Sequence, residues 1–421
     1  METRARHVAV AGAEGRLIGV RRGDGPGPML LCVAALHGNE PSGVEALERV
    51  FARLEADDPE LGGAIVGLSG NLGALARHHR FIDEDLNRVW QRERVAAILE
   101  SLRAGDATGD PSAAPDAPPG PSDTPLPMIG SAELAEQRAL LAAIRGFVRE
   151  ARGPVYVLDL HTTSSESAPF TTLGDTLQNR VFALHLPIPV VLGLEEQIDG
   201  AMLQYFDRLG WCGIGVEGGA HRDPASASAH EATVWILLEA LGVVPRSAVP
   251  DPDGKRDRLA RAAAGLPRVV DVRYRHAIAP EDAFAMDAGF RNFQPIRKGQ
   301  RLGSDARGAV NAPEGGLIFM PLYQKQGDDG FFIVRPVRPV WLGISRWLRG
   351  RRLGDRATWI PGVLRHPDRE DAVILAPWAS NRAVIGLLHL LGYNVRRERG
   401  RVVMVRRVET ARPGGPLDLM E

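Results

Sequence analysis

The sequence predicts an α/β protein: a mostly parallel, mixed sheet flanked by helices, followed by a small β-domain and a small α/β C-terminal appendage. Over residues 1–246, short apolar runs alternate with segments of helical spacing, the pattern of parallel strands covered on both faces. From residue 268, short β-type runs are separated by Gly, Pro, Asp and Asn, which is typical of a small β-domain. The predicted domains are therefore 1–246, 267–339 and 340–421.

Strands of the first domain are predicted where about four to eight apolar residues run together. They fall at 29–36, 64–68, 155–160, 188–194 and 214–217, after edge strands or a hairpin at 7–22. Helical apolar spacing, with Pro or Gly at the boundaries, predicts the helices between them. These helices are predicted at 42–56, 91–102, 131–151, 196–209 and 231–241.

Residues 104–130 are rich in Pro, Gly, Asp, Ala and Ser. A segment of this composition buries too little apolar surface to order itself. It is therefore interpreted as a mobile surface insertion in the first domain.

The β-domain and the appendage are predicted from shorter patterns. The strands of the β-domain are expected at 269–274, 301–302, 317–320 and 331–334, and the appendage has a strand from 372, a helix at 382–391 and strands at 393–396 and 402–406. Residues 340–352 form a basic amphipathic segment, with Trp341, Ile344 and Leu348 on one face. It is interpreted as a packed helix with a solvated basic face, in preference to a helix that lies on a membrane.

The overall composition is that of an ordinary globular protein. There are 51 basic and 52 acidic residues, a formal net charge of -1, which provides no electrostatic argument for a nucleic-acid partner. Two cysteines, Cys32 and Cys212, lie in apolar runs and do not form a disulfide framework. No apolar run approaches the ~20 residues of a spanning helix, and residues 1–12 lack the apolar core of a signal peptide. A cytoplasmic protein without a membrane span is predicted, and an oligomer is compatible with the sequence.

Four residues of metal-site or acid–base type fall at the ends of predicted strands: His37, Glu40, His161 and Glu217. In open α/β sheets, ligands bind outside the carboxyl ends of the strands. Two histidines and one carboxylate leave the fourth tetrahedral position of zinc open to water, as catalytic zinc requires. One zinc ion per chain, held by His37, Glu40 and His161, is therefore predicted.

Glu217 is the candidate general base. A carboxylate beside a zinc-activated water can take its proton and later pass it to a leaving amine. The alternative is a structural carboxylate that accepts hydrogen bonds from neighbouring backbone amides.

The run Gly213-x-Gly215-x-x-Gly218 has the glycine spacing of the dinucleotide-binding fingerprint but not its sequence context. That motif needs a helix that opens within it and a later acid for the ribose. Residues 221–224 are interpreted as not opening a helix, and Glu217 would face the pyrophosphate. A dinucleotide site is therefore rejected, and neither a nucleophile elbow nor a phosphate-binding loop is present in the sequence.

Taken together, these motifs resemble a known family. The chain is similar, over roughly residues 7–245, to the succinylglutamate desuccinylase and aspartoacylase family, within the wider zinc carboxypeptidase group. The matching pieces are His37-Gly38-Asn39-Glu40, Arg80-x-x-Asp83-x-Asp85-Leu86-Asn87-Arg88, Asp159-Leu160-His161 and Val216-Glu217-Gly218. The β-domain also resembles the C-terminal domain of the family, notably at 296–300 and 320–324.

The resemblance implies a zinc carboxypeptidase-like fold and a specific metal site. His37, Glu40 and His161 would hold zinc, as the strand ends already suggest. Asp85 would orient a ligand histidine, the recurring carboxylate–histidine–zinc arrangement.

The resemblance also implies catalytic and substrate-binding roles. Glu217 would be the base and acid, and Arg80 would polarise the scissile carbonyl and hold the developing oxyanion. Asn87 and Arg88 would bind a substrate carboxylate, for which the planar fork of Arg is suited. Tyr323 would reach the site from the second domain.

Two features depart from the family pattern. Aspartoacylases carry an Arg ten residues before the catalytic Glu, where this chain has Asp207, with Arg208 beside it. Recognition of N-acetylaspartate is therefore not predicted. In addition, the tail from about residue 340 has no counterpart in the family.

The predicted function is a zinc-dependent amidohydrolase that cleaves the amide of a small N-acylated amino acid or a similar compound. The alternative within the same class is a zinc carboxypeptidase that acts on peptides. The alternative of another class is a non-enzymatic carrier or scaffold, because the β-domain around Lys298 looks somewhat like a lipoyl domain, with Lys298 or Lys325 as the acylated residue.

Overall fold

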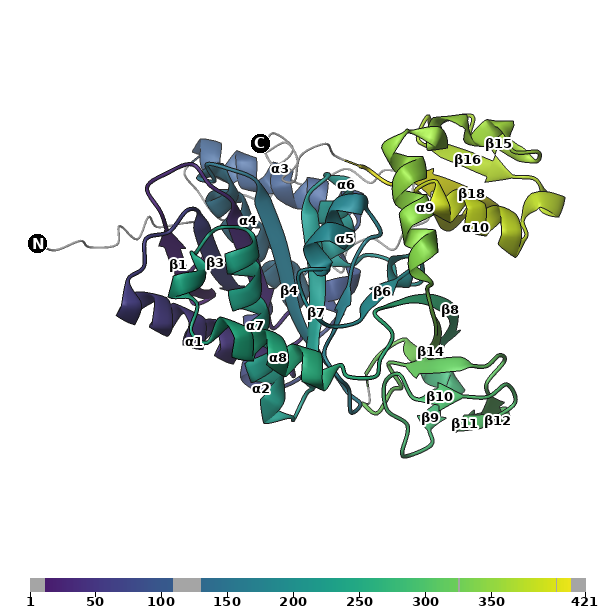
Figure 1. Cartoon of the computed structure of the whole chain (residues 1–421), viewed down its shortest axis with the longest axis horizontal. Helices are drawn as coiled ribbons and strands as arrows, with labels where there is room; N and C mark the ends of the chain where they lie inside the picture. The colour runs from purple at the N-terminus through teal and green to yellow at the C-terminus, as the bar shows by residue number, and fades with distance from the viewer. Residues whose placement is uncertain (1–11, 109–129, 325, 399, 410–421) are drawn as a thin grey trace, which may run out of the picture. The chain divides into compact units, whose positions relative to one another are not determined.

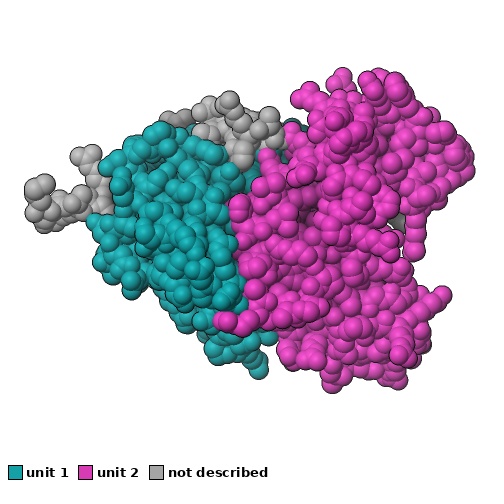
Figure 2. Space-filling model, viewed as in Figure 1, with its two compact units in different colours: residues 1–162, 200–259, 412–421 teal, residues 163–199, 260–411 magenta. Residues whose placement is uncertain are grey.

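The structure is a computed structural model that describes residues 12–108, 130–324, 326–398 and 400–409. These residues form two compact units, distinguished in Figure 2. Unit 1 comprises the described residues of 1–162 and 200–259, and unit 2 those of 163–199 and 260–411. Most of the predicted insertion, residues 109–129, lies outside the described residues. The domain boundaries at 246, 267 and 340 stay a prediction.

Unit 1 contains strands in the order β1-β3-β2-β4-β7 (Figure 1). The strands are β1 (Leu17–Arg22), β2 (Met29–Ala34), β3 (Ala64–Ser69), β4 (Val155–Thr163) and β7 (Cys212–Ala220). The pairs β2–β3 and β2–β4 are parallel, and β1 lies antiparallel to β3 at the edge. The helices are α1 (Ser42–Asp57), α2 (Leu72–Arg77), α3 (Arg92–Thr108), α4 (Ala132–Arg149), α6 (Met202–Arg208), α7 (Pro224–Ala240) and α8 (Pro252–Ala262). The α/β class with a mostly parallel sheet is confirmed.

The sheet of unit 1 is buried on both faces. Met29, Leu31 and Val33 of β2 belong to one core cluster with apolar residues of α3 and α4. The alternate residues of β2 point to the opposite face, the side of α1 and α7, which pack against each other. Figure 1 shows the strands of unit 1 between these two helical layers. Each fully buried Leu contributes about 1.5–3 kcal/mol to this packing. The continuous apolar run of β2 follows from burial on both sides.

Unit 2 contains strands in the order β5-β6-β8-β14-β13-β10, a separate sheet β12-β11-β9, and a third sheet β15-β16-β18-β17. In the first of these, β5–β6 and β6–β8 are parallel, whereas β8–β14, β14–β13 and β13–β10 are antiparallel. The strands are β5 (Phe170–Thr172), β6 (Val190–Leu192), β8 (Val269–Ala277), β9 (Ala285–Met286), β10 (Pro295–Ile296), β11 (Arg301–Asp305), β12 (Gly308–Asn311), β13 (Gly316–Phe319), β14 (Asp329–Pro336), β15 (Val363–Arg365), β16 (Ala372–Leu375), β17 (Tyr393–Glu398) and β18 (Arg401–Arg406). The helices are α5 (Leu177–Ala183), α9 (Pro339–Gly350) and α10 (Arg382–Leu390). The expected β-type region and the small α/β appendage are both present.

Two predicted helices begin at other residues. The helix predicted at 196–209 begins only at Met202, because Gly200 has a left-handed φ of 75° that interrupts helical geometry. The helix predicted at 231–241 already begins at Pro224, because Asp223 caps its N-terminus by accepting a hydrogen bond from Ala225 N. Residues 221–224 therefore do lead into a helix. The dinucleotide motif is still excluded, because its glycines lie within strand β7 and not in a strand-to-helix loop.

Helix α9 packs differently from the prediction. Trp341 and Ile344, expected on a packed face, are 49% and 37% exposed. Leu348 packs against the core cluster of the appendage, whereas Ser345 and Arg349 are the buried residues of the helix. The helix is held by a buried arginine as well as by apolar packing.

Buried ion pairs join the appendage to residues 175–196 within unit 2. Arg349 Nη2 donates to Asp175 Oδ2 at 2.9 Å, and Arg180 Nη2 donates to the same oxygen at 2.8 Å. Arg407 Nη2 donates to Glu195 Oε1 and Glu196 Oε1, both at 2.9 Å. Burial alone would raise the pKa of Asp175, but the surrounding arginines hold that pKa well below its usual range. The tail from about residue 340 is therefore anchored through its charged side chains.

Replacing Asp175 by Asn is expected to destabilise unit 2 by about 3–5 kcal/mol, because it leaves buried arginines without their counter-charge. Because the pKa of Asp175 is lowered on folding, the stability that its charge contributes depends on pH. This contribution is complete above the pKa of the unfolded state, about 3.9, and is lost as the pH falls through the pKa of the folded state. Urea unfolding at neutral pH measures the effect. Asp371→Asn, which breaks an exposed pair with Arg369, should change stability by less than about 1 kcal/mol; equal effects of the two variants would contradict the anchoring role.

Candidate metal centre and active site

The turn between β2 and α1 carries two of the candidate metal ligands. The chain leaves β2 at Ala34, and Ala35 adopts a left-handed φ of 52°. A Cβ on Gly38 would lie 2.0 Å from the backbone carbon of Ala74, so only glycine allows this close approach. Glu40 N donates to His37 O at 3.1 Å, and this short turn brings both side chains to the same side.

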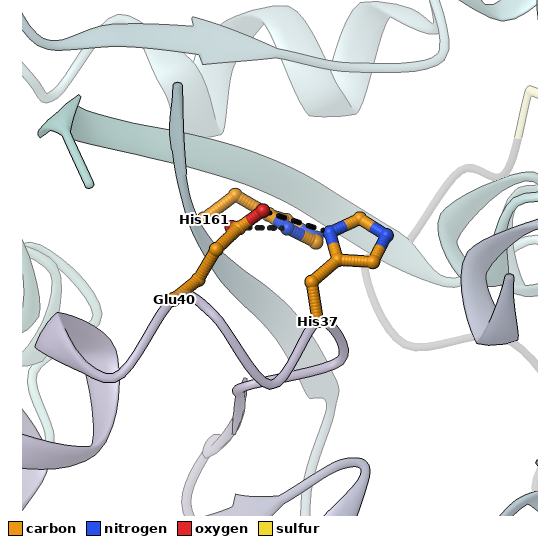
Figure 3. A group of neighbouring side chains, drawn as sticks. All are labelled: His37, Glu40 and His161. Carbon is orange, nitrogen blue, oxygen red and sulfur yellow. Dashed lines mark hydrogen bonds and ion pairs between the residues drawn. The ribbon is translucent and has the colours of Figure 1, made fainter. Parts of the chain in front are cut away.

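His37, Glu40 and His161 converge at the ends of β2 and β4 (Figure 3). One ligand-type atom of each lies within 4.8 Å of the others. His37 Nδ1 lies 2.9 Å from Glu40 Oε1, and His161 Nδ1 lies 3.1 Å from Glu40 Oε2. All three side chains are buried. The structure thus brings together the three residues that the sequence places at separate strand ends.

The other nitrogen of each imidazole faces a carboxylate. His37 Nε2 lies 3.0 Å from Asp85 Oδ1, and His161 Nε2 lies 2.9 Å from Asp159 Oδ2. A carboxylate accepts only, so each Nε2 is assigned a proton. Each Nδ1 faces Glu40, and a metal ion held there would take the Nδ1 lone pairs in place of protons. The donor set fits zinc, and the two carboxylates are the partners that orient metal-binding histidines.

The electrostatics around Glu40 favour its ionised form. Thr162 N donates to Glu40 Oε2 at 2.8 Å, which fixes the carboxylate against the end of β4. Burial opposes ionisation, but His37 and His161 outweigh it and hold the pKa of Glu40 well below its usual range. Burial also lowers the pKa of His161, but Asp159 and Glu40 raise it well above its usual value.

Arg80 and Asp85 form a buried pair beside the ligand set. Arg80 Nε and Nη2 donate to Asp85 Oδ2 at 3.1 and 2.9 Å, and Arg80 Nη1 lies 3.7 Å from Glu40 Oε1. Asp85 thereby bridges Arg80 and His37 with its two oxygens. Burial raises the pKa of Asp85, but Arg80 and His37 bring it well below its usual range. The guanidinium is therefore fixed close to the candidate metal position.

Asn87 and Arg88 lie in the short 3-10 turn Leu86–Arg88. Asn87 Nδ2 lies 3.4 Å from His161 Nε2, and Asn87 Oδ1 accepts a hydrogen bond from Met202 N at 2.9 Å. Arg88 Nη1 donates to Asn87 O at 2.9 Å. The amide of Asn87 is thus held at the start of α6 with its Nδ2 close to His161, at the place where the resemblance implies a substrate contact.

Glu217 lies on β7 and is buried. Among the side chains that the structure describes, none forms a hydrogen bond with its Oε2. Burial, with the nearby Glu40 and Asp159 carboxylates, raises the pKa of Glu217 to about 8 against the opposing effect of His161. A carboxyl group whose pKa is close to neutrality, beside a metal-ligand set, has the properties of a general base or acid.

Tyr323 belongs to unit 2, where both hydrogen-bonding functions of its hydroxyl are used. The hydroxyl donates to Asp287 O and accepts from Phe290 N, each at 2.9 Å, and Tyr323 N donates to Ser164 Oγ at 3.2 Å. The side chain is 39% exposed. Its predicted contact with substrate stays a prediction.

Two buried residues at the site have no role in the sequence-based prediction. Asp159 lies two positions before His161 on β4, so both point to the same face of the sheet, and this spacing could have indicated the pair. His230 of α7 is fully buried behind the strands, and burial lowers its pKa to about 4. Its position follows from tertiary packing, for which the sequence carries no local signal.

Replacing Asp159 by Asn is expected to weaken metal binding by about 10–100-fold, because an amide at this position no longer holds the Nε2 proton of His161 as a carboxylate does. The metal dissociation constant, measured by competition with a chelating dye, checks this. Asp223→Asn, which changes an exposed carboxylate at the start of α7, is the control and should bind metal as the wild type does. An unchanged constant in Asp159→Asn would remove Asp159 from the site.

Comparison with known proteins agrees with these motifs. Residues 26–107 match the model of the succinylglutamate desuccinylase/aspartoacylase catalytic domain, a segment that holds His37, Glu40, Arg80 and Asp85 but neither His161 nor Glu217. The chain is 33% identical over 78 residues to a succinylglutamate desuccinylase of Pseudomonas paraeruginosa, and 36% identical over 76 residues to one of Pseudomonas fluorescens. Each alignment covers 18% of this chain and 24% or 23% of the relative, so the match spans about a quarter of their length.

The fold is also found in a solved structure. An alignment with the crystal structure of a succinylglutamate desuccinylase/aspartoacylase from Rhodobacter sphaeroides covers 76% of this chain and 88% of that protein. The TM-score is 0.52 and the sequence identity is 17%. At this identity the likeness concerns the fold. The family model matches residues of unit 1, the relatives match a part of the chain, and the solved structure shares the fold, so this chain is similar to the succinylglutamate desuccinylase/aspartoacylase family.

Proposed function

We propose that this protein is a zinc-dependent amidohydrolase that removes the acyl group from a small N-acylated amino acid or a similar amide. The observation that carries the proposal is the meeting of His37, Glu40 and His161, with both Nδ1 atoms directed at one carboxylate. The names of the relatives, succinylglutamate desuccinylases, support an amide of this kind. One zinc ion per chain would be held by these three residues.

Zinc at this position supplies Lewis acidity, which lowers the pKa of water toward ~7 and polarises a carbonyl. Glu217 is buried, and its Oε2 has no hydrogen-bond partner among the described residues. It takes the proton from the attacking water and passes it to the leaving amine. Arg80, held by Asp85 through Nε and Nη2, donates from Nη1 to the oxyanion that develops on the carbonyl oxygen. Burial keeps these interactions strong because bulk water does not screen them.

Substrate binding in this proposal depends on Asn87 and Arg88. A guanidinium binds a carboxylate in a planar, two-point geometry, so Arg88 is assigned the carboxylate of the amino acid. Tyr323 is proposed as a further substrate contact. Asp207, at the position where aspartoacylases carry Arg, argues against N-acetylaspartate as the substrate.

The test is a metal analysis of the purified protein, followed by an assay of free amine release from a panel of N-acyl amino acids. We expect about one zinc per chain and turnover that a chelator abolishes and added zinc restores. A parallel peptide panel decides the alternative of a zinc carboxypeptidase, which would instead release C-terminal amino acids.

The carrier alternative has no specific observation in its favour. Lys298 is exposed, and Lys325 lies outside the described residues. An intact mass that shows an acylated lysine would support the carrier, and an unmodified mass supports the enzyme. The described helices include none that is long and apolar enough to cross a bilayer; the cytoplasmic location and the oligomeric state stay predictions.

A further inference from the structure

His230 is a buried imidazole that contacts the chain at or next to the candidate metal ligands His161 and Glu40 and the proposed base Glu217. Its Nε2 lies 2.9 Å from the carbonyl oxygen of His161 and 3.3 Å from that of Val216, the residue before Glu217. Its Nδ1 lies 3.3 Å from Ser42 Oγ, two residues after Glu40. His230 itself is 0% exposed. A single side chain of α7 therefore touches β4, β7 and the start of α1.

The partners of His230 determine its tautomer. A carbonyl oxygen only accepts, so Nε2 carries the proton and donates it between the His161 and Val216 carbonyls. Nδ1 then bears the lone pair and accepts from the Ser42 hydroxyl. The ring is thus neutral, and each nitrogen has a partner of the right kind, as a buried polar group requires.

Close packing fixes the ring in this place. A Cβ on Gly218 would lie 2.5 Å from His230 Nε2, so the glycine after Glu217 lets the imidazole reach the two carbonyls. Gly43, at the start of α1, also leaves no room for a side chain: a Cβ there would lie 2.8 Å from the Cβ of Leu160 on β4. The start of α1, the end of β4 and the middle of β7 consequently meet with little free space around His230.

We propose that His230 is a positioning residue that holds the metal ligand His161 and the base Glu217 at a fixed separation by bridging the backbone of their two strands. The inference rests on the proposed function for the role of Glu217, and on the metal site alone for His161. It differs from the role of Asp85 and Asp159, which orient imidazole rings directly, because His230 acts on the backbone that carries the side chains. Small errors in the placement of reacting groups cost large factors in rate.

The test compares two amide variants of His230. His230→Gln places an amide N–H close to the position of Nε2 and keeps a donor for the carbonyls, whereas the shorter His230→Asn reaches only the region of Nδ1. Thr233→Val is the control: it removes a buried hydroxyl from the same helix, and this hydroxyl has no hydrogen-bond partner among the described residues. The zinc dissociation constant, the visible spectrum of the Co²⁺-loaded protein and the free energy of unfolding are measured for all variants, with kcat and KM where turnover is found.

We expect His230→Asn to weaken zinc binding by about 10–100-fold, the range seen when a residue that supports a ligand is lost, and to change the Co²⁺ spectrum. His230→Gln should recover at least tenfold of that loss, and Thr233→Val should bind as the wild type does. In turnover, His230→Asn should lower kcat and leave KM unchanged, because substrate-binding groups are not moved.

Two results would overturn the inference. One is that His230→Asn has the zinc affinity and Co²⁺ spectrum of the wild type. The other is that the Gln and Asn variants lose equal zinc affinity, in proportion to their loss of free energy of unfolding. The zinc measurements require no substrate. If the wild type hydrolyses no amide on the panel, the proposed function fails, while the comparison of the Gln and Asn variants still decides the role of His230 at the metal site.

Discussion

Glu217→Gln is expected to lower kcat by about 10²–10⁴-fold, the usual contribution of a general acid–base group, with little change in metal content. Glutamine keeps the size of the side chain and removes its capacity to take a proton. The effect should reside in kcat, because Glu217 acts on the reacting water and not on the substrate carboxylate. Steady-state kinetics of the zinc-loaded protein, with the zinc content measured on the same sample, provides the test.

The pH dependence adds a second signature. Glu217 works as a base only when deprotonated, so activity should rise with pH through its pKa. That pKa is raised to about 8 by burial and the neighbouring carboxylates, and a cation at the ligand set lowers it. The acidic limb of the kcat profile should therefore lie below pH 8 and disappear in Glu217→Gln. Glu239→Gln, a change in an ion pair of α7 with Arg246, should preserve both rate and profile; normal turnover in a zinc-loaded Glu217→Gln would remove Glu217 from the mechanism.

His161→Ala is expected to abolish both stable metal binding and turnover. Only His37 and Glu40 would remain as ligands, and a site with two protein ligands does not hold zinc in the manner of catalytic centres, which use three. The loss of affinity should exceed the about 10–100-fold expected when a supporting carboxylate is removed. Equilibrium dialysis against zinc measures the binding directly.

The matched control for this variant is His79→Ala. His79 is exposed, next to Arg80 but outside the ligand set, so its removal should leave the zinc content at one per chain. A His161→Ala protein that still binds one zinc with the wild-type affinity would show that the metal lies elsewhere.

The sequence predicts that His37, Glu40 and His161 lie together, as they do in the structure, because the prediction depends only on local sequence patterns. A ligand-type residue at the end of a parallel strand points to the same edge of the sheet as its neighbours, so His37 and His161 could be brought together without a structure. The pair Asp159 and His161 follows from the same logic, since alternate residues of a strand share a face. The positions of residues along strands do not predict roles for Arg80 and Asp85, which come from the resemblance to a family.

Other features depend on contacts between distant parts of the chain. Asp175 and Arg349 are 174 residues apart, and no spacing rule links them. His230 has no local signal in the sequence, because its contacts are with the carbonyl oxygens of His161 and Val216 on the neighbouring strands. The prediction that this helix begins at residue 196 was wrong for a local reason: the left-handed backbone of Gly200 interrupts it, and the helix begins at Met202.

The central claim is tested most directly by measuring amide hydrolysis by the purified wild-type protein at a controlled zinc content. The protein is stripped with a chelator, reloaded with zinc to one equivalent, and assayed on a panel of N-acyl amino acids by the appearance of free amino groups. The account predicts turnover of at least one member of the panel that rises with zinc and saturates at one zinc per chain. Turnover that is the same in the stripped and the reloaded protein, or one equivalent of zinc bound without hydrolysis of any N-acyl amino acid, would contradict it.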